Sequence, residues 1–510
     1  SSFDENILDS INNFKLVISD KNLLKGIPDH VVKSAHLKAK AKKTKGYLFT
    51  IDFPSYLPIM QYADNRKLRK DIYTAYNTKA SSLMDSKFDN TKNINHILKL
   101  KYEMSKLLGY SNISSMLLKT KMAKSSEEVI SFLSKLTKKA TKSALADIDD
   151  INDIAKEFNI AKVMPWDIPY LSEKLKKEKF SITDEEIKQY FSINNVLHGL
   201  FNICKKIYGL NINETKASTW HEDVKFFEIF NKEKQLVGKF YLDLYARKEK
   251  RGGAWMDEAI SKYKFLNEEE SPVAYLTCNF TPPSNGKAYL THDEVITLFH
   301  EFGHGLHHLL TEVTEYSISG IKGVEWDAVE LPSQFMENYC WEWSVIRDMS
   351  YNKKTSAYMP KKLFNNLLES KNFQSGLQTL RQVEFALFDI KLHTEYSPKN
   401  RSFMKILNNV RAQVSVINTP TWNKFPHSFS HIFSGGYASA YYSYKWAEVL
   451  SADAYSLFEE IGILSKKAGN KFKKEILSKG GSRSAMESFI AFRGRKPKIN
   501  ALLIHHGLSN

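Results

Sequence analysis

Apolar residues recur three and four positions apart over much of the first two hundred residues, as in amphipathic helices. The stretches 93–108 and 126–142 show this spacing clearly. One break is the aromatic run at 46–60, where Pro54 and Pro58 favour a strand-like or looped connection. The pattern therefore predicts a mostly helical region with one extended interruption.

Between residues 224 and 280 the pattern changes to extended structure. Alternating apolar positions, rich in β-branched and aromatic side chains, predict a hairpin over VKFFEIF and LVGKFYLDLYA, with NKEKQ as its turn. The run SPVAYLTCNF predicts a further strand. An extended peptide could add its backbone to an exposed edge of this small sheet, although packing in the core explains the last run equally well.

The helical period returns from Thr291 to Leu310. Thr291 followed by Glu294 matches a capping box. The positions after it provide a broad apolar surface formed by Val295, Ile296, Leu298, Phe299, Phe302 and Leu306. Gly303 and Gly305 each cost about 1 kcal/mol inside a helix, so they indicate that another backbone packs closely here.

This predicted helix carries an H-E-x-x-H sequence. His300 and His304 are four residues apart, so both imidazoles lie on one face and can bind one metal ion. Glu301 lies roughly 100° around the helix axis from His300. A carboxylate there can accept a proton from an activated water. The motif predicts a metal site with Glu301 as general base, and an incidental structural His pair is the alternative.

A catalytic zinc usually takes three protein ligands, so one more is needed. His307 is unsuitable because its helical rise from His300 is about 10.5 Å. We interpret His307 and His308 as groups around the site or on the surface. The following segment offers four acidic candidates, Glu325, Asp327, Glu330 and Glu337.

Glu330 is the preferred third ligand among these four. Pro332 lacks an N–H, so it must kink or begin a helix, and either fixes the direction of the nearby carboxylate. Asp327 could instead orient a ligand histidine, although an ordinary solvated Asp is an equally good interpretation.

A second informative run is FPHSFSHIFSGGYASAYYSYKWAEVL. Two glycines precede a predicted helix on which Tyr437, Tyr441 and Tyr444 share a face. Buried phenols need partners, and peptide hydrolysis needs donors for its oxyanion. Taken alone, however, such a stripe is more often part of a core.

Composition narrows the class of protein. The chain has 510 residues with 42% hydrophobic content and no apolar run near eighteen, which predicts a globular protein with more than one lobe and no membrane span. Three widely spaced cysteines indicate no disulfide framework, and with no signal peptide recognisable they favour a reducing cytoplasm. The net charge of +16 raises the possibility of nucleic-acid binding. Because its densest cluster, 36–46, fits a solvated helix face or loop, we expect no such binding.

Three runs carry a family resemblance: HEFGHGLHHLL, SISGIKG and WDAVELPSQFMEN. Together they resemble the thimet oligopeptidase family of zinc metallopeptidases, and the similarity extends through PWDIPYLSEK to the closing FRGRKP. The resemblance implies one zinc ion bound by His300, His304 and Glu330, with Glu301 as the base that activates water.

The same resemblance assigns His431, Tyr437 and Tyr444 to substrate binding and to stabilisation of the transition state, with Tyr441 on the same face. Family members also carry a further helical segment ahead of the position where SSFDENILDS begins. We expect that segment to be absent here, which would leave the substrate groove partly open.

These inferences combine into one expectation: a mainly α, two-lobed zincin-type metallopeptidase with a small sheet beside the H-E-x-x-H helix. Residues 1–223 would form part of the channel walls. Residues 224–510 would hold the catalytic region, with the sheet at 224–280, the zinc site at 291–345 and the Tyr/His substrate segment at 427–450.

The expected function is zinc-dependent hydrolysis of internal bonds in short peptides. The expected protein is a cytoplasmic monomer with no nucleic-acid or membrane partner. Release of C-terminal dipeptides, or an inactive peptide-binding form, are the alternatives.

Overall fold

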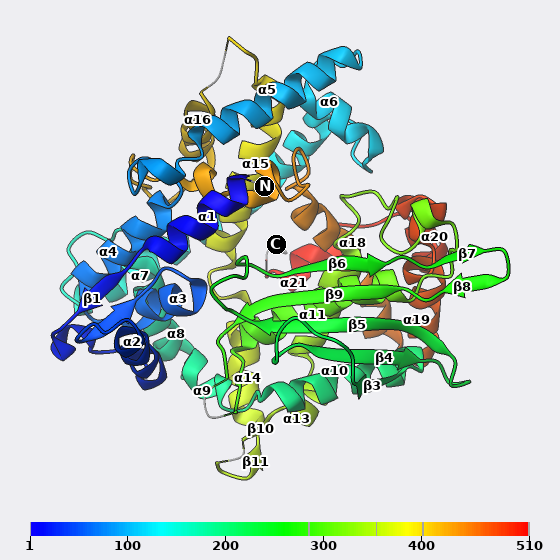
Figure 1. The fold of residues 1–510 in the computed structure, drawn as a ribbon, viewed down its shortest axis with the longest axis horizontal. Coiled ribbons are helices and arrows are strands. Elements are labelled where there is room, and N and C mark those ends of the chain that lie inside the picture. Colours follow the sequence, from blue (N-terminus) through cyan, green and yellow to red (C-terminus); the bar gives the residue numbers. More distant parts are fainter. Residues whose placement is uncertain (1, 284–285, 353, 400–401, 508–510) are drawn as a thin grey trace.

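A computed structural model describes residues 2–283, 286–352, 354–399 and 402–507. Helices dominate, and one small sheet lies to one side of the molecule (Figure 1). The predicted mainly α fold is therefore confirmed. Among the described helices, none combines the length and apolar content needed to cross a membrane.

The region before the sheet is helical, as predicted. Its helices are α1 (Ser2–Asn13), α2 (Asp29–Ala41), α3 (Phe53–Tyr62), α4 (Arg66–Thr78), α5 (Thr91–Leu107), α6 (Ile113–Leu117), α7 (Ser126–Glu157), α8 (Ile168–Phe180), α9 (Asp184–Lys188) and α10 (Ile193–Tyr208). Strands β1 (Leu16–Ile18) and β2 (Tyr47–Phe49) pair antiparallel. The basic cluster at 36–46 begins on α2 and continues into the loop after it, and most of its lysines are solvent-exposed.

The prediction of a strand or loop over 46–60 is only partly right. The run begins as β2, but its second half is α3, which starts after Asp52. Pro54 lies in the first turn, where the missing N–H costs nothing. Pro58 lies inside α3, and burial of Ile59 and Met60 in the core outweighs the hydrogen bond that it removes.

The sheet has five strands in the order β3-β4-β5-β9-β6. They are β3 (Asn211–Thr215), β4 (Lys225–Phe230), β5 (Leu236–Tyr245), β6 (Trp255–Ile260) and β9 (Val273–Phe280), and the hairpin β7 (Tyr263–Phe265) and β8 (Glu268–Glu270) extends from it. The predicted hairpin is the β4–β5 pair. The run VAYLTCNF is β9, which lies between β5 and β6, so its backbone is already paired and the core-packing interpretation holds for it. The edge next to it is β6.

After the sheet the chain returns to helix. The elements are α11 (His292–Leu309), α12 (Leu331–Glu337), α13 (Trp343–Met349), β10 (Tyr351–Asn352), β11 (Ala357–Tyr358), α14 (Lys361–Glu369), α15 (Ser375–Glu395), α16 (Phe403–Val414), α17 (Ser430–Phe433), α18 (Ser443–Ile461), α19 (Lys466–Phe472), α20 (Ala485–Arg493) and α21 (Asn500–His505).

Separate hydrophobic cores underlie the two sides of the molecule. The largest joins the sheet, α11 and the C-terminal helices, and includes Phe240, Phe302 and Phe335. Another joins α7 to α15 and α16, two helices that come after the sheet in the sequence. Figure 1 shows α15 and α16 among the blue and cyan helices rather than beside the sheet. The cores therefore do not follow chain order, and the division at residue 223 stays a prediction.

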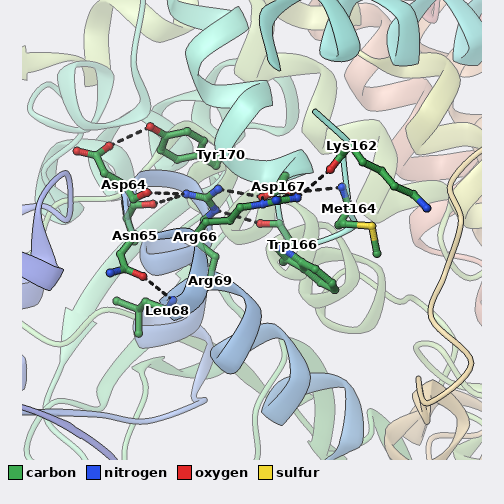
Figure 2. A network of polar contacts seen from close by, with 11 residues as sticks. Asp64, Asn65, Arg66, Leu68, Arg69, Lys162, Met164, Trp166, Asp167 and Tyr170 are labelled. Carbon is green, nitrogen blue, oxygen red and sulfur yellow. Dashed lines mark hydrogen bonds and ion pairs between the residues drawn. The ribbon is translucent and has the colours of Figure 1, made fainter. Parts of the chain in front are cut away.

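A buried ion-pair network fastens α4 to the segment before α8 (Figure 2). Asp167 is completely buried and accepts hydrogen bonds from Arg66 Nη2 at 2.6 Å and Arg69 Nη2 at 2.9 Å. Arg69 is only 1% exposed, and Tyr170 lies under its guanidinium at 4.1 Å. Removal of the carboxylate would leave a buried charge without its counter-ion, which is costly.

We expect Asp167→Ala to lower the free energy of unfolding by about 3–5 kcal/mol, the usual cost of breaking a buried ion pair from one side. Urea denaturation followed by circular dichroism measures it. Asp71→Ala is the matched control because its partner Lys67 is 81% exposed, and a change below about 0.5 kcal/mol is expected there. Equal losses of stability in the two variants would contradict a stabilising role of the buried Asp167 ion pairs.

A second buried acid, Glu173 of α8, lies beside another carboxylate. Its Oε1 accepts hydrogen bonds from the Tyr62 hydroxyl at 3.0 Å and from the backbone N–H of Asp184 at 3.3 Å. Burial, and then the charge of Asp184, raise the pKa of Glu173 to about 7. The folded protein therefore holds a proton here that an unfolded chain releases at lower pH.

The raised pKa of Glu173 predicts a pH-dependent loss of stability. Its contribution is fully present below the unfolded pKa and is lost as the pH rises through about 7. Glu173→Gln mimics the protonated acid, so between pH 5 and pH 8 its free energy of unfolding should fall less than that of the wild type, by on the order of 1–3 kcal/mol. Urea titrations at both pH values measure these free energies. An equal change between pH 5 and pH 8 in the wild type and in Glu173→Gln would refute the prediction.

Candidate metal centre and substrate cleft

Helix α11 is capped as the sequence predicts. The Thr291 hydroxyl accepts a hydrogen bond from the Glu294 N–H at 3.1 Å, and the Glu294 carboxylate accepts one from the Thr291 N–H at 2.8 Å. The helix buries Val295, Leu298 and Phe299 completely. These contacts fix its rotation about its own axis, and hence the direction of the histidines one turn further on.

Gly303 allows α12 to approach α11 closely, which was the predicted reason for a glycine there. A Cβ atom on Gly303 would lie 2.5 Å from both the Pro332 carbonyl oxygen and Ser333 Cα. Gly305 instead faces the side chain of Leu276 on β9, at 3.0 Å from such a Cβ. The missing side chain at Gly303 therefore brings the start of α12 against the histidine-bearing helix.

Three predicted ligands meet between these two helices. Glu330 Oε2 lies 3.1 Å from His300 Nε2 and 3.1 Å from His304 Nε2, and one ligand atom from each of the three lies within 4.8 Å of the others. Two donors bound tetrahedrally to zinc at about 2.0–2.1 Å are roughly 3.3 Å apart. The spacing and the donor types of these residues therefore fit a metal ion.

Glu330 is held firmly in place. It stands immediately before α12, and Pro332 in the first turn begins that helix, the second of the two outcomes predicted for this proline. The Ser333 hydroxyl donates to Oε2 at 2.9 Å, and the Tyr437 hydroxyl donates to Oε1. Burial opposes ionisation of Glu330, but His304 and His300 outweigh it and hold its pKa well below the usual range.

Glu337 makes a contact with a candidate ligand that sequence reasoning missed. It was one of four candidate ligands, but it is the last residue of α12 and its Oε1 lies 2.6 Å from His300 Nδ1. A carboxylate on the far nitrogen fixes the orientation of the ring and directs Nε2 toward the metal position. The only sequence signal was an acidic residue seven positions after Glu330, about two helical turns further along the chain.

Asp327 makes no hydrogen bond or ion pair with a candidate ligand histidine, and it is not solvated, so both interpretations offered for it are wrong. It is fully buried and accepts hydrogen bonds from the N–H groups of Met122 and Ala123 and from the Tyr442 hydroxyl, at 2.7 to 2.9 Å. It therefore ties a loop of the first region to the Tyr/His segment at 427–450, the tyrosine segment.

Glu301 and the two later histidines of α11 are all buried. Glu301 Oε2 has no hydrogen-bond partner in the described structure, and burial raises the pKa of this carboxyl. A surface position for His307 and His308 is wrong, because their exposed fractions are only 3% and 0%. Burial lowers the pKa of His307 to about 3, so its ring is neutral.

The tyrosine segment is not the helix that its spacing predicted. Helix α18 begins only at Ser443, and Ser439 adopts a left-handed backbone conformation with φ of 52°. The buried carboxylate of Asp389 accepts three backbone N–H bonds at 2.9 Å, from Ser439, Ala440 and Tyr441. One side chain on α15 thus replaces the hydrogen bonds that a helix would supply, a long-range contact that periodicity does not reveal.

The turn still gathers the predicted residues. Tyr437 and Tyr444 stack with ring centroids 5.1 Å apart, and the His431 ring lies 5.8 Å from Tyr437 and 6.2 Å from Tyr444. Burial lowers the pKa of His431, so this ring is neutral near pH 7. Through the contact between Tyr437 and Glu330, the cluster adjoins the metal ligands.

A cleft of about 970 Å³ adjoins both groups of residues. His300 and Glu337 line it from the metal side, and Tyr444 and His431 from the tyrosine segment. The remaining wall comes from both regions of the chain and includes Tyr73, Pro165, Trp341, Arg381 and Leu502. The cleft is large enough to hold several residues of a peptide.

Comparisons with known proteins agree with this geometry. The chain is 47% identical to oligopeptidase A of Salmonella typhimurium and of Escherichia coli strain K12, over 100% of its own length and 76% of theirs. It is 29% identical to the dipeptidyl carboxypeptidase of E. coli, over 100% of its length and 75% of that relative.

Among solved structures, PZ peptidase A with an inhibitor matches with a TM-score of 0.56 at 15% identity, covering 94% of this chain and 76% of that one. This likeness supports the zincin-type fold. The model of peptidase family M3 matches residues 59–508. The chain therefore belongs to peptidase family M3 and is a metallo-endopeptidase, as its resemblance to the thimet oligopeptidases implied.

Proposed function

We propose that this metallopeptidase uses one zinc ion and hydrolyses internal bonds of short peptides. The observation that carries the proposal is the convergence of Glu330 Oε2 on His300 Nε2 and His304 Nε2, at 3.1 Å from each. Two imidazoles and one carboxylate are a known donor set for catalytic zinc. When bound, zinc supplies a Lewis acid that polarises a carbonyl group and makes a water molecule more acidic.

Glu301 is the proposed general base. Its Oε2 is buried beside the ligand histidines without a hydrogen-bond partner in the described structure. It is free to take the proton of the attacking water and to pass it to the nitrogen of the leaving amine. Burial raises its pKa, which strengthens the carboxylate as a base.

Tyr444 and His431 are the proposed donors to the substrate. The carbonyl oxygen of the scissile bond becomes negative in the transition state, and a hydroxyl fixed at the cleft wall stabilises it there. Tyr437 donates to Glu330 Oε1, so we assign it to hold the ligand carboxylate with Oε2 directed at the metal.

Short peptides are the proposed substrates because His300, His431 and Tyr444 line a cleft of only about 970 Å³. The name of the relatives that are 47% identical, oligopeptidase A, supports the same class. Strand β6 is an edge strand of the sheet, and an extended peptide can add to such an edge by backbone hydrogen bonds. We further propose a cytoplasmic monomer that binds no nucleic acid.

Release of C-terminal dipeptides is the second candidate, favoured by the similarity to a dipeptidyl carboxypeptidase. Mass spectrometry of the products of a ten-residue peptide separates the two. Internal fragments identify an endopeptidase, whereas successive loss of two residues identifies the alternative.

We expect Glu301→Gln to retain zinc and to lower kcat at least 100-fold, because a positioned base contributes about 10²–10⁴ in rate. The assay is cleavage of an internally quenched fluorescent peptide, which a chelator should abolish in the wild type. Glu312→Gln removes an exposed carboxylate beyond the end of α11 and should leave the rate unchanged. Full activity of the metal-loaded Glu301→Gln protein would remove the base assignment.

Two variants of acidic residues should affect zinc differently. Glu330→Ala deletes a ligand, so the purified protein should contain little zinc after dialysis. Glu337→Gln leaves all three ligands and should weaken zinc binding by about 10–100-fold, the usual effect of losing a carboxylate behind a ligand histidine. Elemental analysis and competition with a chromogenic chelator measure both. Full zinc content in Glu330→Ala would refute the proposed ligand set.

A further inference from the structure

Two arginines share one carboxylate oxygen at the wall of the cleft. Arg381 Nη1 and Arg411 Nε both donate to Glu384 Oε1, at 3.0 and 2.9 Å. The side chains of Glu384 and Arg411 are only 3% and 10% exposed, whereas Arg381 is 41% exposed. The cluster therefore carries one surplus positive charge, and the exposed guanidinium of Arg381 presents it to the cleft.

The fold does not need Arg381 to neutralise Glu384. Arg411 already pairs with that buried carboxylate, and its Nη2 donates to Asn423 Oδ1 at 3.1 Å. Within the described residues, Arg381 makes no other hydrogen bond than the one from Nη1 to Glu384. Its guanidinium carbon lies 4.2 Å from the centroid of the Phe385 ring, and this stacking leaves the remaining N–H donors available.

A continuous row of rings links Arg381 to the catalytic cluster. Tyr444 lies 5.1 Å from Tyr441, Tyr441 lies 5.8 Å from Phe385, and Arg381 stacks on Phe385. The Tyr441 hydroxyl donates a hydrogen bond to Oε1 of Gln382, the residue after Arg381, at 3.1 Å. An extended peptide advances about 3.3 Å per residue, so this row is as long as a few residues of substrate.

We propose that Arg381 is a specificity-determining residue that binds a carboxylate of the peptide substrate a few residues from the scissile bond. A planar guanidinium with free N–H groups matches a carboxylate in a paired arrangement. The carboxylate is either the free C-terminus or an Asp or Glu side chain. This inference rests on the proposed function, since it names the chemistry of the peptides that the same cleft selects.

The test compares three quenched peptides of one core sequence: a free C-terminal acid, its C-terminal amide, and the amide with a Glu near that end. The proteins are the wild type, Arg381→Gln, Arg381→Lys and the control Lys391→Gln. Lys391 lies on the same helix α15 and bonds only to the exposed Gln413 side chain, so its variant removes an equal charge away from the cleft.

We expect Arg381→Gln to raise KM for the free acid by about tenfold or more, the worth of one charge-assisted hydrogen bond, with little change in kcat. KM for the plain amide should not change. Arg381→Lys should recover part of the loss, and Lys391→Gln should behave as the wild type. Arginine-dependent binding of the amide that carries Glu would identify a side-chain carboxylate as the ligand. Equal effects of Arg381→Gln on all three peptides would overturn the proposal.

Calorimetry on the Glu301→Gln protein separates this inference from the proposed function. It measures the binding of the same peptides without their cleavage. If the wild type cleaved none of them, the proposed function would fail, and the preference for carboxylate peptides that depends on Arg381 would still be tested by binding. Equal dissociation constants with and without Arg381 would then refute the inference.

Discussion

The buried carboxylate of Glu330, placed between two imidazoles, is the contact on which the rest of the site depends. A fully buried acid is expensive to ionise unless positive or polar partners surround it. Glu330 has the two histidines, the Ser333 hydroxyl and the Tyr437 hydroxyl. Four partners from three separate segments must arrive together, so the site can form only when the whole fold around it has formed.

Close approach of two helices makes that contact possible. Gly303 on α11 lets the backbone at Pro332 and Ser333 lie where a side chain would otherwise be. The helix start at Pro332 then fixes where Glu330 points. On the other side of His300, Glu337 ends the short helix that Glu330 caps, so α12 positions both the proposed third ligand and the carboxylate that orients the first.

Buried aspartates play a similar part further from the metal position. Asp389 binds three consecutive N–H groups of the tyrosine turn, and Asp327 binds two N–H groups of a distant loop together with Tyr442. Each carboxylate satisfies backbone donors that no secondary structure satisfies. Because Asp389 lies on α15, which packs along α7, the helices of the first region set the position of the tyrosines opposite the metal ligands.

The sequence by itself determined what depends on local spacing. The capped helix at 291–310, the shared face of His300 and His304 and the β4–β5 hairpin all follow from periods and propensities within a few residues. Tertiary structure alone decided what depends on contacts between distant residues. The role of Glu337, the backbone contacts of Asp327, and the turn that replaced a predicted tyrosine helix all arise because buried polar groups must find partners wherever the fold places them.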